Sequence, residues 1–393
     1  MNYISIQRLA EQGHIAIKTG PFGTQLKATE YVNHGIPVLN VRNLGFAVVN
    51  TDKMEMVSAE TLERLSAHKL VTGDIVLGRK GAVEKHAFIS SDENGWMQGS
   101  DCIRLRVLTD IINPRFLSYY FLTKKYKAFM ISMCSHGTTM PSLNQKIIEK
   151  IEVPLLERSI QDRIVGILSV LDRRIATNQK INENLEQQAQ TLYAHTFPYT
   201  TSDILPEGWR LGTVGEIIEL HDSKRIPLSG AQREKMEKKI YPYYGAASLM
   251  DYVDEYIFDG KYLLLGEDGT VVDDAGFPIL QYVWGRFWVN NHAHILTGKL
   301  GYNVESLYML FKQTPVKSIV TGAVQPKISQ TNLKSIVVVI PPANLLESFN
   351  EQVDAMFSLI RKNEHENKCL AALRDSLLPK LMSGEIDVTT LKI

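Results

Sequence analysis

Two long stretches of the chain carry apolar residues at alternating intervals of four and three residues. The first lies within 158–196, which contains no proline, and the second lies within 345–382. A heptad spacing sustained for about four heptads predicts helices that pair along one seam. The predicted seam positions are Ile164, Leu168, Leu171, Ile175, Asn178, Asn182, Leu185, Ala189 and Leu192, then Phe349, Val353, Met356, Ile360, Asn363, Asn367, Leu370 and Leu377.

Two asparagines interrupt each seam at equivalent positions, Asn178 and Asn182 in the first helix and Asn363 and Asn367 in the second. A polar residue in an apolar seam lowers stability but fixes the register of the pair. We therefore expect the two helices to pair antiparallel, with the asparagines facing each other near the middle. The alternative is that these asparagines lie on a solvated edge.

Strands and short helices are predicted between the heptad stretches. Alternating or apolar runs bounded by Gly, Asp and Pro indicate strands, and four such runs are DIVLGRKG (74–81), CIRLRVL (102–108), KYLLLGEDG (261–269) and SIVVVIPP (335–342). Helical windows lie at 59–67, 113–132 and 306–313. The predicted fold class is therefore α+β, with twisted, partly curled sheets.

The chain also repeats itself. GTTMPSLNQKIIEKIEV starts at Gly137 and GAVQPKISQTNLKSIVV starts at Gly322, an offset of 185, and GRKGAV at Gly78 corresponds to GEDGTV at Gly266. Such a period is far too long for a solenoid or a propeller. We expect two tandem α/β domains with pseudo-two-fold symmetry, joined by two long antiparallel coiled-coil helices: a first domain at 1–157, a spacer helix at 158–200, a second domain at 201–343, and a second spacer helix and tail at 344–393.

Charge and cysteine content narrow the class of protein. The chain has 43 basic and 43 acidic residues, whereas a protein that binds DNA alone usually has a basic excess. The three cysteines are far apart, which argues against a disulfide framework or a zinc site. No signal peptide or membrane-spanning run is recognisable. We expect a cytoplasmic protein without membrane contact.

Polar loops in both domains are the candidate ligand contacts, because Gly, Lys, Arg and Asn in loops suit phosphate and base recognition. For any one of these residues, turn chemistry in a solvated loop is the alternative. The candidates in the first domain are Lys18, Thr19, Phe22, Thr24, Gln25, Lys27, Asn40, Arg42, Asn43, Arg79, Lys80, His136, Thr138 and Thr139. Those in the second domain are Ser223, Lys224, Arg225, Tyr243, Tyr244, Asn290, Asn291, His292 and His294.

Catalytic and metal-binding patterns are missing from the sequence. His292 and His294 have no third ligand nearby in sequence, so we expect no metal site. P-loop, Rossmann, HExxH and GxSxG motifs do not occur, nor does the Asn/Asp-Pro-Pro-aromatic motif of amino-methyltransferases. A self-sufficient enzyme is therefore disfavoured. A DNA-reading module and a non-enzymatic scaffold with two ligand-binding domains unrelated to DNA both remain open.

Several motifs together resemble the specificity subunit of type I restriction–modification enzymes, over essentially the whole chain. They are GPFGTQLK, GDIVLGRKGAV and GTTMPSLN in the first half, and LPEGWR, YPYYGAASLMDYVDEYIFDGKYLLLGEDG, FWVNNHAHIL and LRDSLLPKLMSGEI in the second. One feature departs from a simple repeat: Glu267 and Asp268 stand where the first copy has Arg79 and Lys80. The two domains are therefore not expected to read DNA in the same way.

The resemblance implies a non-catalytic chain that binds no cofactor itself. Each domain would read one half of a split, asymmetric sequence in double-stranded DNA, and the paired helices would hold the halves at a fixed separation. Two modification subunits, which bind S-adenosylmethionine and methylate adenine, would dock on the helices. Restriction subunits would add translocase and nuclease activity that depends on ATP and Mg²⁺. The partners would then supply much of the phosphate contact that a neutral chain lacks.

Overall fold

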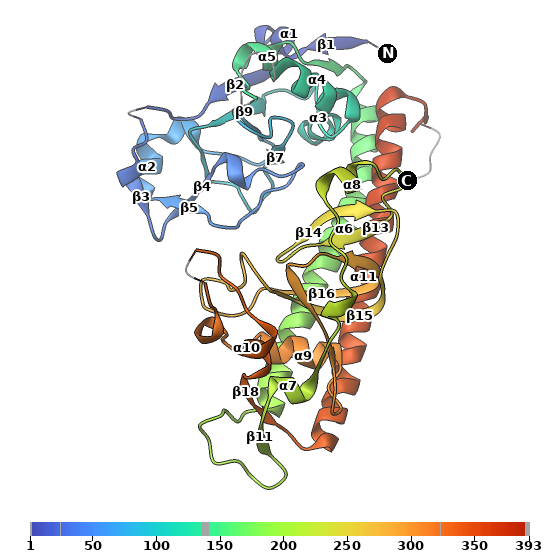
Figure 1. Ribbon diagram of the computed structural model, residues 1–393. Coiled ribbons are helices and arrows are strands. Elements are labelled where there is room, and N and C mark those ends of the chain that lie inside the picture. The colour runs from blue at the N-terminus through green and yellow to red at the C-terminus, as the bar shows by residue number, and fades with distance from the viewer. Residues whose placement is uncertain (1, 24, 135–140, 323, 390–393) are drawn as a thin grey trace. The chain divides into compact units, whose positions relative to one another are not determined.

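The computed structural model describes residues 2–23, 25–134, 141–322 and 324–389 and has the predicted α+β fold (Figure 1). The chain forms two compact units. One consists of Met1–Ala176 together with Asn367–Ile393, and the other of Thr177–Glu366. Among the described residues, no helix is both long enough and apolar enough to cross a membrane.

Two four-stranded sheets form the first domain. One is antiparallel with the order β2-β9-β6-β7, and the other has the order β3-β5-β4-β8, in which β4 and β8 are parallel. The predicted strands at 74–81 and 102–108 are confirmed as β6 and β9, which are neighbours and largely buried. The strands are β2 (Ile15–Thr19), β3 (Tyr31–Val32), β4 (Ile36–Leu39), β5 (Glu55–Val57), β6 (Ile75–Gly78), β7 (His86–Phe88), β8 (Met97–Gln98) and β9 (Cys102–Val107).

The helical window predicted at 113–132 is two helices, α3 (Pro114–Tyr120) and α4 (Lys124–Cys134). Thr123 separates them because its hydroxyl donates back to the carbonyl of Tyr120 and accepts from the N–H of Tyr126, as a helix cap does. The other short helices of this domain are α1 (Ile6–Glu11), α2 (Ala59–Arg64) and α5 (Gln145–Glu149), with short 3₁₀ turns at Ala28–Glu30, Val41–Asn43 and Ser66–His68.

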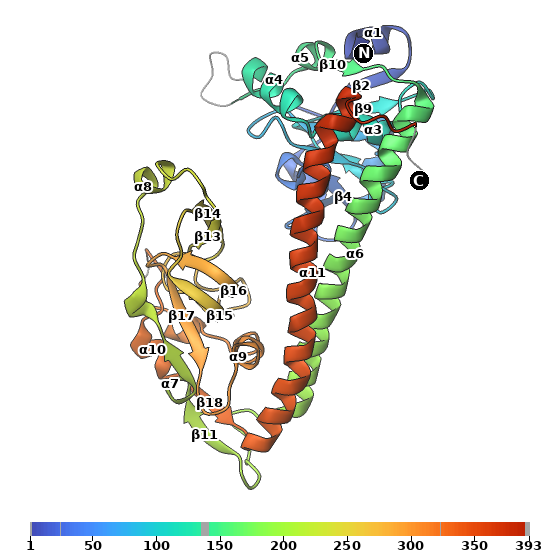
Figure 2. The same cartoon turned by 90° about the vertical axis from the view of Figure 1, so that its right-hand side faces the viewer.

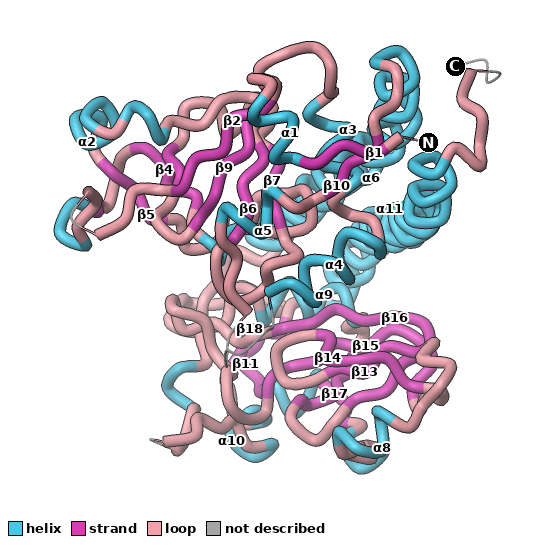
Figure 3. Tube along the Cα trace, turned by 90° about the horizontal axis from the view of Figure 1, so that it is seen from above, coloured by secondary structure: helices cyan, strands magenta, loops and turns pink. Residues whose placement is uncertain are grey.

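The second domain contains one six-stranded sheet with the order β12-β17-β15-β16-β13-β14. Figure 3 shows strands β13 to β17 of this sheet from above. The predicted strand at 261–269 is confirmed as part of β15. The helix predicted at 306–313 is α9, whose residues are all buried. The elements are β12 (Ile218–Leu220), β13 (Tyr241–Tyr244), β14 (Leu249–Val253), β15 (Phe258–Gly266), β16 (Leu280–Val289), β17 (Ala293–Gly298), α7 (Val214–Ile217), α8 (Gly230–Glu234), α9 (Val304–Phe311) and α10 (Gln330–Lys334), with 3₁₀ turns at Asp222–Lys224 and Lys317–Ile319.

The repeated sequence closes each domain in the same way. In the first copy, the N–H of Gly81 donates to the carbonyl of Pro141 (3.2 Å) and the N–H of Leu143 donates to the carbonyl of Arg79 (2.8 Å). In the second copy, Gly269 donates to Pro326 (3.0 Å) and Ile328 to Glu267 (2.8 Å). The repeat therefore fastens the glycine turn that follows β6 and β15. Each closing segment then pairs with the domain's first strand: β10 (Glu152–Pro154) with β1 (Tyr3–Ser5), and β18 (Val337–Ile340) with β11 (Arg210–Thr213).

The two heptad stretches form α6 (Arg158–Thr196) and α11 (Ala343–Ser383), which lie side by side within each unit (Figure 2). In the first unit, Ile164 and Leu168 of α6 share a buried cluster with Leu378 and Leu381 of α11. In the second unit, Ala189 and Tyr193 share one with Phe349, Val353 and Phe357. The start of each helix thus meets the end of the other, so the predicted antiparallel coiled coil is confirmed.

Asparagines lie inside this helix pair. Asn178 and Asn363 are 0 % and 5 % exposed, so neither lies on a solvated edge. The side-chain amide of Asn363 donates to the side-chain oxygen of Asn182 (2.9 Å), and that of Asn178 donates to a carboxylate oxygen of Glu366 (3.0 Å). These bonds form in one alignment of the two helices, which is how a buried polar pair fixes register.

Each domain docks on the helices through a charged cluster. The sign of the charge that the domain contributes is opposite in the two clusters. On α3, Arg115 and Tyr119 donate to Asp172 of α6 at 3.1 and 2.6 Å, and Arg374 of α11 joins them at 3.0 Å. On α9, the fully buried Glu305 accepts from Arg361 of α11 at 3.0 Å and from Lys261 at 2.8 Å. The first domain therefore presents a cation to α6, whereas the second presents an anion to α11.

Replacing Asn182 and Asn363 together by Leu should raise the melting temperature and produce a mixture of oligomers. Both hydrogen-bonding partners are removed at once, so neither is left unpaired, while the polar pair that fixes the register is lost. The single variant Asn363→Leu is the control and should melt lower than the double variant. Calorimetry with light scattering gives both readouts. A double variant that melts lower than the wild type as a single species would contradict the assignment.

His86 on β7 is a buried titratable group. It is fully enclosed, its Nε2 lies 2.9 Å from the Ser118 hydroxyl, and its ring meets Phe121 edge-on. Burial lowers the pKa of His86 to about 3, and the charge of Arg115 adds to that effect. In the folded domain the imidazole therefore stays neutral over the pH range in which the same histidine gains a proton in the unfolded chain.

The first domain should lose about 1.4 kcal/mol of stability through His86 between pH 7.5 and pH 5.5. The unfolded histidine, with a pKa of about 6.5, gains a proton in this window and the folded one does not, so protons favour unfolding. Hydrogen exchange of the β6 amides measures the opening free energy at each pH. This pH dependence should shrink in His86→Leu and persist in the exposed control His34→Leu. An equal pH dependence in both variants would contradict the prediction.

Candidate nucleic-acid interface

The loop after β2 is positioned by contact between two glycines. A Cβ atom on Gly20 would lie 2.0 Å from the carbonyl oxygen of Gly99, and the N–H of Gly20 donates to the carbonyl of Cys102 (2.9 Å). The Gln98 side chain donates to the carbonyl of Lys18 (2.9 Å). A loop glycine can allow the close approach of a ligand to the backbone. At Gly20 the close approach is instead to the protein's own backbone, and it sets the direction of the loop.

Beyond Gly20 the loop presents side chains to solvent. Phe22 is 59 % exposed, and the guanidinium of Arg79 lies 6.0 Å from the centre of its ring. Lys80 is exposed, with its amine 3.8 Å from Asp101. Gln25 and Lys27 are also exposed, while Lys18 and Thr19 are half-buried. An aromatic ring beside a cation suits a base and a phosphate, respectively.

Asn40, Arg42 and Asn43 have different environments although they are adjacent in sequence. Glu55 accepts from Asn40 (2.7 Å) and pairs with Arg42 (2.9 Å), which keeps half of its side chain exposed. Asn43 is fully buried, and its amide donates to the carbonyls of Asn50 and Asp52. Arg42 is therefore open to solvent, and Asn43 holds the loop that carries it.

In the second domain, Arg225 belongs to a buried ion-pair network. Its side chain is 13 % exposed and donates to Glu267 (2.5 Å) and to the carbonyl of Ala293 (2.8 Å). The Nδ1 of His294 lies 2.6 Å from Asp222, and its Nε2 lies 2.8 Å from the carbonyl of Ile328. Both ring nitrogens therefore have an oxygen atom as hydrogen-bond partner.

Charges within the network balance each other. Burial alone would raise the pKa of Asp222, but the hydrogen bond and charge of His294 outweigh it, so the pKa lies below its ordinary value. Burial would likewise raise the pKa of Glu267. The hydrogen bond from Arg225 and the charge of His294 outweigh this effect, so the pKa of Glu267 also lies below its ordinary value. Asp222, Glu267 and His294 bring three possible metal-ligand atoms within 4.8 Å of one another. Their oxygens and ring nitrogens are engaged by neighbouring donors and acceptors, as in a salt-bridge network.

Four predicted residues of the second domain reach the surface. Ser223, Lys224 and Asn291 are exposed, and His292 is half-buried with its Nδ1 2.6 Å from Asp268. Tyr244 is half-buried and meets Phe287 edge-on. The remaining candidates are enclosed: the Tyr243 hydroxyl accepts from the N–H of Leu228 (3.1 Å), and Asn290 is 4 % exposed.

Burial therefore corrects part of the predicted set. The side chains that the structure encloses as supports, rather than presenting them to a ligand, are Asn43, Arg225, Tyr243, Asn290 and His294. Thr24, His136, Thr138 and Thr139 lie outside the described residues. For the exposed candidates, contact with DNA stays a prediction.

Sequence reasoning missed an exposed aromatic residue among lysines. Phe46 is 44 % exposed, and the amines of Lys127 and Lys85 lie 4.3 and 5.8 Å from the centre of its ring. Two signals were present in the sequence: the apolar loop GFAVV at 45–49 and the basic run KKYK at 124–127. The two runs are about 80 residues apart in the chain, and the fold brings them together.

The chain is similar to known proteins over most of its length. A family model described as type I restriction modification DNA specificity domain matches residues 3–187 and again 206–374. The MjaIX type I restriction enzyme specificity subunit of Methanocaldococcus jannaschii is 23 % identical, over 98 % of this chain and 94 % of that protein. The EcoprrI specificity subunit of Escherichia coli is 22 % identical, over 68 % and 67 %. The S subunit of a type I restriction–modification system from M. genitalium superposes with a TM-score of 0.56 at 18 % identity, over 97 % of this chain and 95 % of that one, and shares the fold.

Gly20→Ala should displace the loop at 18–27, because the added Cβ meets backbone rather than a side chain that can move. Overpacking of this kind costs about 1–3 kcal/mol. The matched control is Gly23→Ala: Gly23 has a positive φ of 65° but open space around it, so its cost of about 1 kcal/mol stays local. Hydrogen exchange at the Gly20 and Gly99 amides should accelerate in the first variant alone. Equal protection in both variants would show that the contact does not position the loop.

Proposed function

The chain belongs to the family of type I restriction–modification DNA specificity subunits, and on that premise we propose that it chooses the DNA sequence on which such a complex acts. Each domain reads one half of a bipartite target in double-stranded DNA. The first domain does so with surface groups such as Phe22, Arg42 and the half-buried Arg79, and the second with Lys224, Asn291 and the half-buried His292.

The observation that carries this proposal is a shared scaffold with different surfaces. The turn after β6 and the turn after β15 are fastened by equivalent backbone hydrogen bonds. The first turn carries Arg79 and Lys80, and the second carries Glu267 and Asp268. Arg79 and Lys80 suit guanine edges and phosphates, whereas Glu267 and Asp268 are held by Arg225 and His292, so the second turn offers a different surface. Two such domains fit two different half-sequences, which makes the target asymmetric.

The paired helices serve as the spacer between the half-sites. α6 has 39 residues and α11 has 41, so each is about 60 Å long at 1.5 Å per residue. The buried Asn182–Asn363 hydrogen bond fixes their register. A fixed register supports a fixed gap between the two half-sites.

The chain is non-catalytic and acts through partners in the cytoplasm, where the DNA is. Two modification subunits bind S-adenosylmethionine and methylate adenine, and restriction subunits bring ATP- and Mg²⁺-dependent translocation and cleavage. The absence of known catalytic motifs and the equal numbers of acidic and basic residues support this division of labour. The partners contribute phosphate contacts and the chemistry, and this chain contributes base readout.

Arg42→Ala should change methylation at one half of the target and leave the preference for the other half intact. If Arg42 contacts a base edge, its loss costs about 1–3 kcal/mol at one position. The readout is a methylation map of random DNA with the complex reconstituted from modification subunits and this chain. Arg8→Ala, an exposed arginine on α1, is the control and should leave the map unchanged.

Three outcomes separate the possibilities in this experiment. A uniform loss across all sequences would reassign Arg42 to phosphate contact. Absence of sequence-specific, salt-dependent DNA binding by the wild-type complex would favour a scaffold unrelated to DNA. Methylation by the purified chain alone would show that it is an enzyme.

A further inference from the structure

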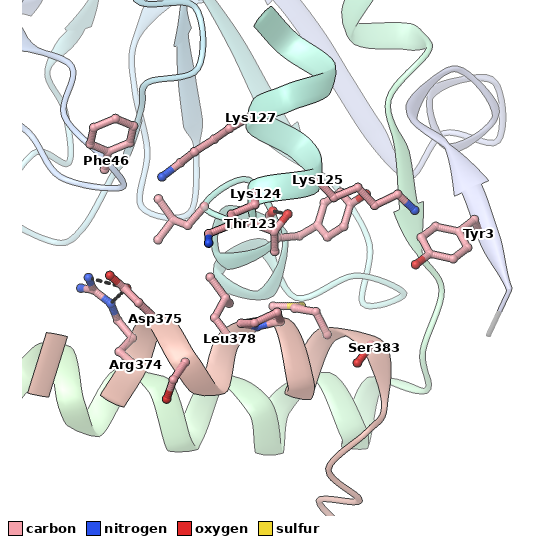
Figure 4. Close-up of a pocket in the computed structure, with 15 residues that line it drawn as sticks. Tyr3, Phe46, Thr123, Lys124, Lys125, Lys127, Arg374, Asp375, Leu378 and Ser383 are labelled. Atoms are coloured by element: carbon pink, nitrogen blue, oxygen red, sulfur yellow. Dashed lines mark hydrogen bonds and ion pairs between the residues drawn. The ribbon is translucent and has the colours of Figure 1, made fainter. Parts of the chain in front are cut away.

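A cavity of about 620 Å³ lies between α4 and the last turns of α11, entirely within the first unit (Figure 4). Its floor is apolar and comes from Leu122 and from Leu378, Pro379 and Met382 of α11. The exposed ring of Phe46 forms part of its wall. Leu378 and Met382 are each 4 % exposed, so Phe46 and Pro379 supply most of the apolar surface that faces solvent. An apolar lining in a concave site is the usual mark of a binding surface.

The rim of the cavity is cationic. Lys124, Lys125 and Lys127 line it from the start of α4, and no carboxylate among the described residues pairs with any of the three within 4.0 Å. Lys125 and Lys127 instead rest their amines 4.2 and 4.3 Å from the centres of the Tyr3 and Phe46 rings. The acidic group of the lining, Asp375, is already paired with Arg374 at 2.9 Å. The lining therefore has an excess of positive charge, which an acidic occupant would balance.

The α11 backbone adds a polar feature on the same face. Pro379 lies inside the helix and has no N–H, so the carbonyl of Asp375, four residues earlier, lacks its helical donor. Pro379 and Asp375 both line the cavity. An occupant with a hydrogen-bond donor beside its apolar residues would match this carbonyl.

The corresponding place in the second unit is closed. Lys312 and Gln313 follow α9 as Leu122 and Thr123 follow α3, and Gln190 of α6 corresponds to Asp375 of α11. The side chain of Gln313 donates to the carbonyl of Gln190 (3.2 Å), and Lys312 pairs with Glu186. Where the first unit has the eleven residues of α4, the described residues of the second have the 3₁₀ turn Lys317–Ile319. The cavity thus breaks the symmetry between the two halves.

We propose that the α4–α11 cavity docks an acidic amphipathic helix of one modification subunit, and that the two modification subunits therefore bind this chain unequally. The proposal rests on the proposed function. A helix that lays apolar residues into a groove and places carboxylates along its edge matches both the floor and the rim. Duplex DNA would satisfy the lysines but has no apolar side chains with which to fill the floor.

Calorimetric titration of the modification subunit into the full chain tests the proposal. The wild type should show two binding steps of different affinity. The double variant Lys124→Glu/Lys127→Glu should weaken one step by roughly tenfold or more, because repulsion replaces attraction, and leave the other step unchanged. The matched control, Lys235→Glu/Lys238→Glu, makes the same change at exposed lysines of the second domain and should leave both steps unchanged.

A second variant separates shape from charge. Ser376→Trp places a large ring in the cavity from an exposed position of α11 without changing charge, and it should weaken the same step. Two unchanged steps in both variants, or an equal loss in both steps, would overturn the proposal. So would a loss confined to DNA binding, which would assign the lysines to nucleic acid. A wild-type chain that binds no modification subunit would instead contradict the proposed function itself.

Discussion

Both compact units depend on the apolar seam between α6 and α11. The core of the first unit includes Ile164 from one helix and Leu378 from the other, and the core of the second includes Tyr193 and Phe349 in the same way. The largest core cluster of each domain includes side chains of both α6 and α11. The helix pair is therefore part of each domain's fold as well as the element that joins the two domains.

The charged clusters decide which domain docks on which helix. Arg115 of the first domain meets Asp172 on α6, whereas Glu305 of the second domain meets Arg361 on α11. Exchanging the domains would place Arg115 against Arg361 and Glu305 against Asp172. Repulsion between like charges, with the loss of both partly buried pairs, disfavours that arrangement. A duplicated scaffold needs this difference in charge, because each domain would otherwise fit either helix.

The features set by periodicity could be predicted from the sequence, and those set by three-dimensional neighbours could not. The heptad spacing predicted α6 and α11, and the apolar runs predicted β6, β9 and β15. The candidate site was harder, because the same residue types build contact surfaces and buried networks. Arg42 and Asn43 are adjacent and equally suited to a base edge, yet Glu55 holds one at the surface while the carbonyls of Asn50 and Asp52 enclose the other. The contact of Gly20 with Gly99 joins residues that follow different strands, β2 and β8, which spacing along the chain does not reveal.

The composition of the first unit has a consequence for synthesis of the chain. Residues 1–176 complete their core with residues 367–393, so the ribosome must make the whole intervening unit before the first can close. At about 5–20 residues per second, this delay lasts roughly 10–40 s. Throughout it, Ile164 and Leu168 lack the α11 side chains that cover them in the finished protein. The exposed apolar side chains make such a nascent chain a substrate for chaperones. When several ribosomes translate one mRNA, the uncovered α6 segment of one chain lies near the same segment of its neighbours.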